Sequence, residues 1–179
     1  MMQIIKINIM NKTNLTAAEG IQKLKDLVEE IYVCLFCTNL KVDDGATCRP
    51  MGAQDVDEQG DIWFFSDAAS DKNAEIKADK NVQLFFAHPG KNSYMVVNGQ
   101  AEIIVDRNKI EALWSPLVKT WFKEGKDDPN ISLIKVTTNN AYYWDAEGNQ
   151  MINFIKMIAT VATGKNLAGA KEGEIDLNN

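Results

Sequence analysis

Four side chains in one short part of the sequence have the chemistry to hold a phosphate group. Arg49 lies in the run TCRPMGAQ, and Ser66, Ser70 and Lys72 lie in the run FFSDAASDK. A phosphate monoester carries about two negative charges at neutral pH, and cations and hydroxyl groups bind it through charge-assisted hydrogen bonds. An arginine can donate two parallel hydrogen bonds to such an anion. The spacing therefore predicts a small phosphate site in a chain that has only two arginines.

The elements predicted around these residues would bring them together. We expect a strand over 48–54, a hairpin turn at VDEQGD, and a strand over 61–67 that ends near Ser66. Ser70 would start a short helix over 70–79, where unpaired N–H groups and the helix dipole attract anions. The alternative is that Ser70 only caps this helix and that Lys72 is solvated. Hairpin pairing favours the phosphate site, because it would place Arg49 close by.

The rest of the chain predicts a mainly β (α+β) fold. A capping box of Thr16 and Glu19 predicts a helix over 16–30, and Gly99 predicts a bend or bulge inside a long strand. A second apolar helix face over 110–121 contains Pro116, a residue that suits a first helical position. Six strands at short spacing indicate an antiparallel barrel with helices outside. They are expected at 31–39, 48–54, 61–67, 82–88, 93–105 and 132–146, followed by an amphipathic helix over 151–163.

Composition excludes several classes of function. The formal net charge of −6 argues against general binding to nucleic acid or to an anionic membrane surface. We expect no signal peptide, because polar residues interrupt the apolar part of the N-terminal segment. An odd number of cysteines, Cys34, Cys37 and Cys48, leads us to expect a cytoplasmic protein with free thiols.

Several segments resemble the flavin-binding split barrels related to pyridoxamine 5′-phosphate oxidase, and most closely the general stress protein 26 branch. The similarity covers roughly 15–165 and lies in seven motifs in the expected order. They are CRPMGAQ, WFFSD, the S-x-K of Ser70 and Lys72, YMVVNGQAEI, IEALWSPLVKTWF, GKDDPNISLIKV and AYYWDA. The resemblance implies a six-stranded antiparallel split β-barrel with flanking helices, which dimerises and binds FMN at the subunit interface.

The resemblance also implies roles for individual residues. The FMN phosphate would be bound by two cations and two hydroxyl groups, those of Arg49, Lys72, Ser66 and Ser70. The isoalloxazine ring and ribityl chain would lie beside three residues, Pro50, Met51 and Phe65. Gln54 occupies the position near which the oxidases place a substrate-facing lysine. Further candidates for covering the ring from the partner chain are Trp114, Trp121 and Tyr94.

Other motifs have structural interpretations. Cys34 and Cys37 have redox spacing, but strand alternation puts them on opposite faces, so we expect core thiols. His88 is the only histidine, which argues against a multi-histidine metal site, and it is expected at a strand end. Trp114 and Trp121 lie seven residues apart on one helix face, which favours packing in the core or in a dimer over a ligand lid.

Three functions follow from the resemblance. The first is an FMN-dependent oxidoreductase that uses NAD(P)H or another small molecule. The second is a non-catalytic flavin-binding stress protein, and the third is pyridoxamine 5′-phosphate oxidase itself, which the lack of any arginine after Arg107 disfavours. A deazaflavin or haem could replace FMN. The predicted domain limits are an extension over 1–14, an FMN-binding split barrel over 15–150, and a helix with a flexible tail over 151–179.

Overall fold

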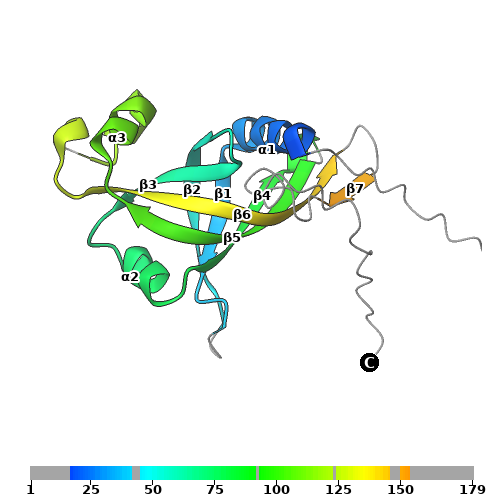
Figure 1. Cartoon of the computed structure of the whole chain (residues 1–179), viewed down its shortest axis with the longest axis horizontal. Helices are drawn as coiled ribbons and strands as arrows, with labels where there is room; N and C mark the ends of the chain where they lie inside the picture. The colour runs from blue at the N-terminus through cyan, green and yellow to red at the C-terminus, as the bar shows by residue number, and fades with distance from the viewer. Residues whose placement is uncertain (1–16, 42–44, 92, 123, 146–149, 154–179) are drawn as a thin grey trace, which may run out of the picture.

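The computed structural model describes residues 17–41, 45–91, 93–122, 124–145 and 150–153. Its strands are β1 (Val33–Thr38), β2 (Thr47–Val56), β3 (Asp61–Asp67), β4 (Asn81–His88), β5 (Ser93–Ile104), β6 (Ile131–Asp145) and β7 (Gln150–Asn153). Its α-helices are α1 (Ala17–Ile31), α2 (Asp71–Ala78), α3 (Arg107–Leu113) and α4 (Pro116–Lys119). Two short 3₁₀ turns, η1 (Pro89–Lys91) and η2 (Gly125–Asp127), complete the described elements (Figure 1).

The first six strands form one closed antiparallel barrel. Their order is β3-β2-β1-β4-β5-β6, and β3 also pairs with β6, which closes the sheet on itself. Closure removes the exposed sheet edges that would otherwise need protection. The predicted six-stranded barrel is confirmed, and the helices lie outside it (Figure 1).

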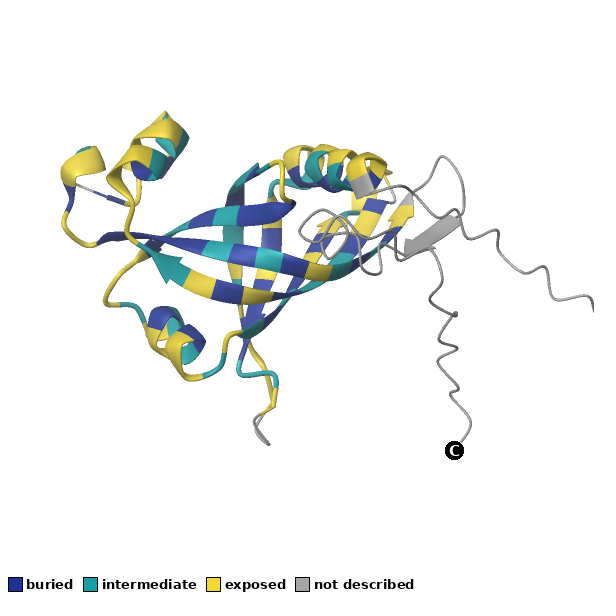
Figure 2. Ribbon diagram, viewed as in Figure 1, coloured by how far each residue is buried: buried dark blue, intermediate teal, exposed yellow. Residues whose placement is uncertain are grey.

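Strand alternation fills the barrel interior. On β1, Cys34 and Phe36 are buried, whereas Val33 and Leu35 between them are exposed, because successive side chains in a strand point to opposite faces. Figure 2 shows the same alternation along β5 and β6. Each large apolar side chain buried in this way contributes about 1.5–3 kcal/mol.

The helix α1 packs against the barrel through one apolar face. Leu24, Leu27 and Val28 are buried, and the helix contacts β2 and β4. It ends at Tyr32, which has a positive φ of 61° and donates its N–H to the Val28 carbonyl at 2.7 Å. The predicted helix is confirmed, while the Thr16 half of the predicted capping box lies outside the described residues.

The long strand β5 is irregular at Gly99. Its register with β6 shifts between Asn98 and Gly99. A Cβ atom at Gly99 would lie 2.5 Å from the carbonyl oxygen of Thr137, so the close approach of the two strands requires glycine. The bend predicted at this residue is confirmed.

The segment after β6 corrects one prediction. Residues 151–153 belong to strand β7, not to a helix, and β7 pairs antiparallel with the outer part of β6. The amphipathic pattern suited a helix, but β6 extends past its pairing with β3 and offers hydrogen-bonding groups to another strand. The remaining part of the predicted helix, 154–163, lies outside the described residues.

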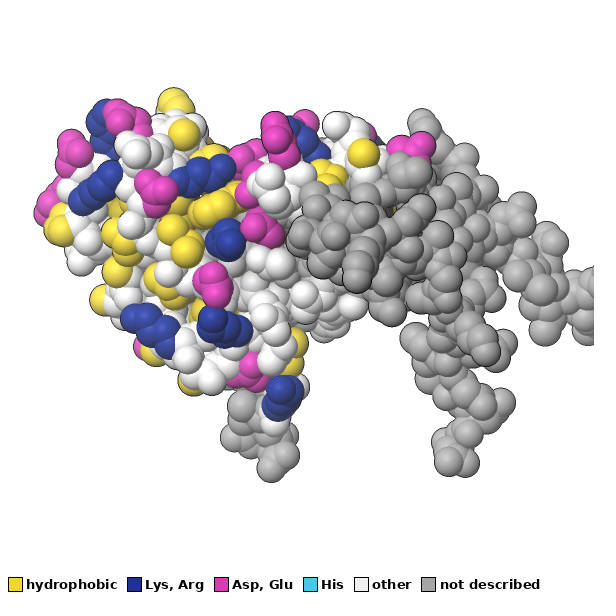
Figure 3. Space-filling model, viewed as in Figure 1, with side chains coloured by type: hydrophobic (Ala, Val, Ile, Leu, Met, Phe, Trp, Pro, Cys, Tyr) yellow, Lys and Arg dark blue, Asp and Glu magenta, His cyan; other side chains and the backbone are white. Residues whose placement is uncertain are grey.

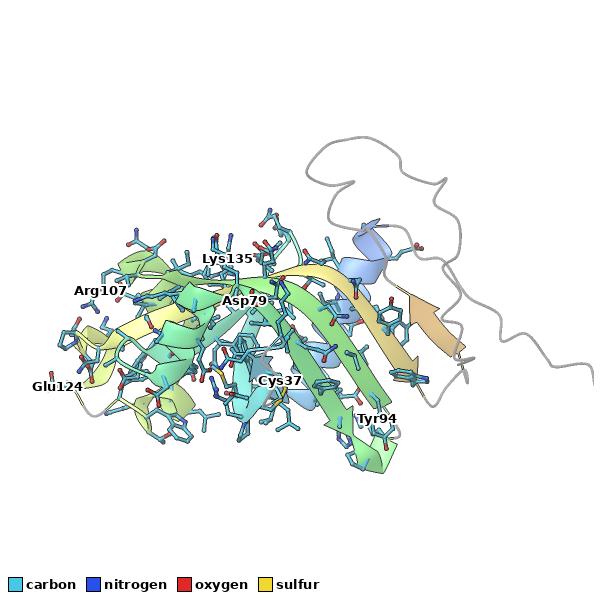
Figure 4. The ribbon with its side chains drawn as sticks, turned by 90° about the horizontal axis from the view of Figure 1, so that it is seen from below. Cys37, Asp79, Tyr94, Arg107, Glu124 and Lys135 are labelled. Atoms are coloured by element: carbon cyan, nitrogen blue, oxygen red, sulfur yellow. A yellow bond between two sulfur atoms is a disulfide. The ribbon has the colours of Figure 1, made fainter. Side chains whose placement is uncertain are left out.

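The cysteines correct another prediction. Cys37 and Cys48 face each other in the β1–β2 register and form a disulfide, with Cα atoms 4.1 Å apart. Figure 4 labels Cys37 and draws the sulfur bond in yellow. Cys34 is a buried free thiol, and burial raises its pKa to about 12. The expectation of free thiols is therefore right for Cys34 and wrong for the other two.

A second hydrophobic cluster lies under α3 and α4. The predicted helix face over 110–121 is broken at Trp114, and α4 begins with Pro116 as predicted. Trp114 packs against Phe65, with ring centroids 5.9 Å apart, so packing is its observed role. Trp121, in contrast, is 82% exposed.

Candidate phosphate site at the start of α2

The site forms where β3 passes into α2, below the barrel in Figure 1. Ser66 lies near the end of β3, and its side chain is buried. Ser70 is the N-cap residue of α2, and Lys72 lies in the first turn. The Oγ atoms of Ser66 and Ser70 are 3.4 Å apart, and Lys72 Nζ donates to Ser70 Oγ at 3.1 Å. The three side chains predicted from the sequence therefore form one continuous group.

Arg49 reaches this helix from β2. Its Nη2 atom donates to Glu75 Oε2 at 2.6 Å, and Glu75 lies one turn after Lys72 on α2. The same carboxylate oxygen accepts from Thr38 Oγ1 at 2.6 Å. Arg49 is therefore held at the helix by a charged hydrogen bond, which is roughly twice as strong as a neutral one.

A buried polar network fixes the position of Ser66. Its hydroxyl donates to Asn73 Oδ1 at 2.7 Å, and Asn73 Nδ2 donates to Ser132 Oγ at 2.9 Å. Ser132 Oγ then donates to the Ser66 carbonyl at 3.1 Å, which closes the ring. Because Asn73 and Ser132 are buried, breaking this network would leave unsatisfied polar groups.

The charges in the group perturb one another. Burial lowers the pKa of Lys72, and the positive charge of Arg49 lowers it further, while Asp67 and Glu75 act in the opposite direction. Burial would raise the pKa of Glu75, but hydrogen bonds from Thr38 and Arg49 and the two nearby cations lower it below its ordinary value. Arg49 and Lys72 are thus close enough to repel each other, as two cations that share an anion would be.

Hydrogen-bonding capacity remains at the site. Arg49 Nη1 is buried and has no hydrogen-bond partner among the described residues. Ser70 has the extended backbone of an N-cap residue, but its side chain accepts no hydrogen bond from the N–H groups of α2. Its hydroxyl instead donates to the Asp67 carbonyl at 2.6 Å. A phosphate oxygen would suit these groups, since a buried donor left unpaired costs about 1–3 kcal/mol.

The other predicted residues lie along β2 and β3, away from this group. Gln54 donates to Tyr32 OH at 3.0 Å, and at about 3.3 Å per residue it lies roughly 16 Å from Arg49 along β2. Met51 packs against the barrel core, whereas Pro50 is exposed opposite Leu35. Phe65 turns away from Ser66 into the second hydrophobic cluster.

Sequence reasoning missed three residues of the site, Thr38, Asn73 and Glu75. The sequence places Asn73 and Glu75 in the short helix over 70–79 and predicts no role for either. One signal was present for Glu75, because it lies three residues after Lys72, where helical side chains are neighbours. The part of Thr38 depends on the β1–β2 register, which the sequence pattern alone did not fix.

A family model described as pyridoxamine 5′-phosphate oxidase like matches residues 19–168. The chain belongs to this pyridoxamine 5′-phosphate oxidase-like family. The match includes the whole barrel and every residue of the candidate site. The family resemblance expected from the sequence is thereby confirmed.

Solved structures of similar proteins confirm the split-barrel fold. A protein from Clostridium acetobutylicum, related to general stress protein 26 of B. subtilis, superposes with a TM-score of 0.64 at 20% identity and covers 78% of this chain and 96% of its own. The general stress FMN/FAD binding protein from Xanthomonas citri has a TM-score of 0.60 at 26% identity, with coverages of 70% and 87%.

A curated relative matches part of the chain. Protein bli-3 of Neurospora crassa is 26% identical over 113 residues, which are 59% of this chain. The matched region spans only 54% of the length of bli-3. In the part of this chain that the structure describes, there is no helix with the length and hydrophobicity needed to cross a membrane.

Proposed function

We propose that this protein binds FMN, with the flavin phosphate held at the start of α2. The observation that carries the proposal is the buried Arg49 Nη1, which has no hydrogen-bond partner in the described part of the chain and lies near Lys72 and two serine hydroxyl groups. Two cations and two hydroxyl groups suit a phosphate monoester better than any neutral group. That a similar protein from Xanthomonas citri is described as FMN/FAD binding supports the choice of a flavin.

We propose, as the family resemblance implies, that the flat part of the ligand extends from the phosphate along β2. Pro50, Met51 and Gln54 follow Arg49 on this strand, and Gln54 offers an amide at its far end. Figure 3 shows hydrophobic side chains gathered on the surface between α2 and α3. Apolar walls with a few placed polar groups are typical of sites for ring systems. We assign Pro50, Met51, Gln54 and Phe65 to this part of the site.

Bound FMN would supply the redox chemistry, and the protein would supply binding and orientation. Arg49 and Lys72 would neutralise the phosphate, and the buried Ser66 network would keep the hydroxyl groups in place. An oxidoreductase that takes electrons from NAD(P)H or another small molecule is the activity we propose.

The test of FMN binding is the visible spectrum of the purified protein. We expect a yellow protein that releases FMN on denaturation, or a colourless protein that quenches the fluorescence of added FMN. A protein that is colourless and fails to quench would reject the proposal. Release of FAD or a phosphate-bearing deazaflavin would keep the site and change the ligand, whereas release of haem, which has no phosphate, would reject a phosphate site.

Catalysis is tested separately on the FMN-loaded protein. Anaerobic addition of NAD(P)H should bleach the bound flavin at a rate well above that of free FMN. A loaded protein that stays oxidised under these conditions would be a flavin-binding protein without this activity. Production of pyridoxal phosphate would instead identify the oxidase reaction.

We also propose that the protein forms a homodimer through the outer face of β1, β4, β5 and β6. Leu35 of β1 lies directly opposite Phe85 of β4, and Tyr94 of β5 lies opposite Trp144 of β6. All four are exposed, and residues directly opposite each other in a sheet share one face. Figure 4 labels Tyr94 at one end of this face. A continuous exposed apolar face of this kind is typical of a protein interface.

The dimer is tested by light scattering on two variants. Leu35→Asp should convert the protein to a monomer, because it buries a charge in the proposed interface. Leu117→Asp, at an exposed apolar position on α4 outside this face, should leave the mass unchanged. A monomeric wild-type protein would contradict this interface.

A further inference from the structure

The candidate site contains a negative charge at the position where a phosphate site is expected to be purely basic. Glu75 lies on the same helix as Lys72, and its Oε2 atom contacts Arg49 Nη2 at 2.6 Å. A carboxylate so close to the predicted phosphate would repel it if both bound the same edge of the guanidinium. The structure indicates that they use different nitrogen atoms.

The guanidinium of Arg49 is divided between two neighbours. Nη2 is used by Glu75, while Nη1 is buried and has no hydrogen-bond partner within the described ranges. The Glu75 carboxylate is fixed in turn by Thr38 Oγ1, which donates to the same Oε2 atom at 2.6 Å. Thr38 is fully buried on β1, so the anchor of Arg49 extends from the helix to the barrel wall.

We infer that Glu75 is the positioning residue of the phosphate site. It holds Arg49 through Nη2 so that Nη1 is presented to the ligand, and Thr38 holds Glu75. This inference rests on the proposed function and deepens it, since it explains how one arginine from β2 is aligned with the start of α2. An arginine side chain loses conformational entropy when it is fixed in one rotamer. Because Glu75 already fixes Arg49 before the ligand binds, this entropy loss does not weaken the affinity for the ligand.

Glu75 also sets the charge that the site presents to a ligand. Arg49 and Lys72 are positive and Glu75 is negative, so the three side chains carry a net charge of about +1 at neutral pH. Without Glu75, Arg49 would lose the carboxylate that pairs with it, and the two cations would face each other with Asp67 as the nearby negative charge until a ligand bound. The site should therefore remain ordered before binding and still attract a phosphate.

A double-mutant cycle on FMN affinity tests the inference. Glu75→Ala should weaken FMN binding by about tenfold, as expected for coupled residues in one polar network. In an Arg49→Ala background the same substitution should have little effect, because no arginine remains to be positioned. Equal losses in both backgrounds would overturn the inference.

Three controls separate positioning from general damage. Glu75→Gln keeps a side-chain oxygen that can accept from Arg49 and Thr38, so it should bind FMN at least as tightly as the wild type; a fall as large as that of Glu75→Ala would overturn the inference. Riboflavin, which lacks the phosphate, should bind Glu75→Ala and wild type equally; a parallel loss would also overturn it. Glu111 lies on α3 and pairs with Lys126 of η2. Glu111→Ala removes this carboxylate and should leave FMN affinity unchanged.

Failure of the inference can be told from failure of the proposed function. If wild-type protein binds FMN and Arg49→Ala weakens it while Glu75→Ala does not, the phosphate site stands and Glu75 does not position it. If wild-type protein binds no FMN, the proposed function fails and the inference fails with it.

Discussion

Two helix starts on the same barrel are built differently. At α3, the N-cap residue Asp106 accepts hydrogen bonds from the N–H groups of Asn108 at 2.9 Å and Lys109 at 3.2 Å. At α2, the side chain of the N-cap residue Ser70 accepts no hydrogen bond from the backbone N–H groups of the helix, and its Oγ accepts from Lys72 Nζ instead. The start of α3 is thus capped by a side chain, whereas the cap residue of α2 holds a cation and offers no side-chain acceptor to the helix N–H groups.

The two arginines of the chain differ in the same way. Arg107, next to the cap of α3, is exposed and donates to the Lys126 carbonyl at 3.1 Å. Arg49 is partly buried and is anchored by Glu75, and its Nη1 atom has no hydrogen-bond partner among the residues that the structure describes. The comparison teaches that positive charge alone does not mark a site; a cation that is fixed on one side and unsatisfied on the other does.

The largest expected effect is on the free energy of unfolding, when the Cys37–Cys48 disulfide beside Arg49 is removed. Cys48 precedes Arg49, and its bond to Cys37 has a sequence separation of 11, whereas the α3 segment contains no cysteine. Cross-links that close a loop of this size stabilise proteins by about 3 kcal/mol. Replacing both residues, Cys37→Ser with Cys48→Ser, should lower the free energy of unfolding in urea by that amount.

The reductant dithiothreitol supplies the control for this experiment. It should destabilise the wild type to a similar degree and leave the double variant unchanged. A wild-type urea midpoint that does not respond to the reductant would show that this bond does not support the site.

The arginines provide the next test of the comparison. Arg49→Ala should weaken FMN binding by about tenfold or more, since a charged hydrogen bond contributes roughly 1.5–3 kcal/mol. Arg107→Ala should leave the affinity unchanged, because this side chain serves a surface loop. Fluorescence quenching of FMN measures both constants, and equal losses in the two variants would remove the distinction between the two helix starts.

Lys72→Ala sharpens the same test on the helix itself. Lys72 lies at the site and the exposed Lys77 lies one turn further on. Lys72→Ala should weaken FMN binding by about tenfold, as expected for loss of a charged partner of the phosphate. Lys77→Ala should bind as the wild type does in the same titration, and the idea of a localised site is lost if it does not.

The caps should show opposite effects. Asp106→Ala removes a satisfied cap and should lower the free energy of unfolding by about 1 kcal/mol, with FMN affinity unchanged. Ser70→Ala removes no cap bond, so stability should change less, while FMN affinity should fall. Thermal unfolding measures the stability of both variants, and an FMN titration measures their affinities. A Ser70→Ala variant that loses stability but keeps its FMN affinity would identify Ser70 as a structural residue.

The smallest effect concerns acid pH. The pKa of Glu75 is lowered below its ordinary value of 4.5, so its contribution to stability is complete above that value and is lost as the pH falls through the lower folded pKa. The difference in unfolding free energy between the wild type and Glu75→Gln should therefore be largest at neutral pH and shrink below pH 4.5. A difference that does not depend on pH would mean that the charge of Glu75 plays no part.

The fold could be predicted because each strand carries a local signal. Alternation along segments such as SYMVVNGQAEIIV and the turn residues between them mark all six barrel strands. Strand β7 was not predicted, because it forms by pairing with the outer part of β6. Local periodicity in the sequence does not reveal this pairing. The Cys37–Cys48 disulfide was not predicted for a similar reason, since it depends on the register between β1 and β2.

The residues of the candidate site could be predicted where their side-chain type alone indicates phosphate binding. Arg49, Ser66, Ser70 and Lys72 have side chains suited to phosphate, and the hairpin places the first near the others. Glu75 was not predictable in the same way, because an acidic residue on a polar helix has no local feature that distinguishes anchoring from solvation. The role of Glu75 follows only from the fold, which brings Thr38 of β1 and Arg49 of β2 into contact with it on α2.

The most direct test of the central claim is the ratio of the affinities for FMN and riboflavin, which differ only in the phosphate. For the wild type we predict that FMN binds at least about tenfold more tightly, as two charged contacts to the phosphate imply. The ratio should fall close to one in the variant that combines Arg49→Ala with Lys72→Ala. Equal affinities in the wild type, or an unchanged ratio in the variant, would contradict a phosphate site at the start of α2.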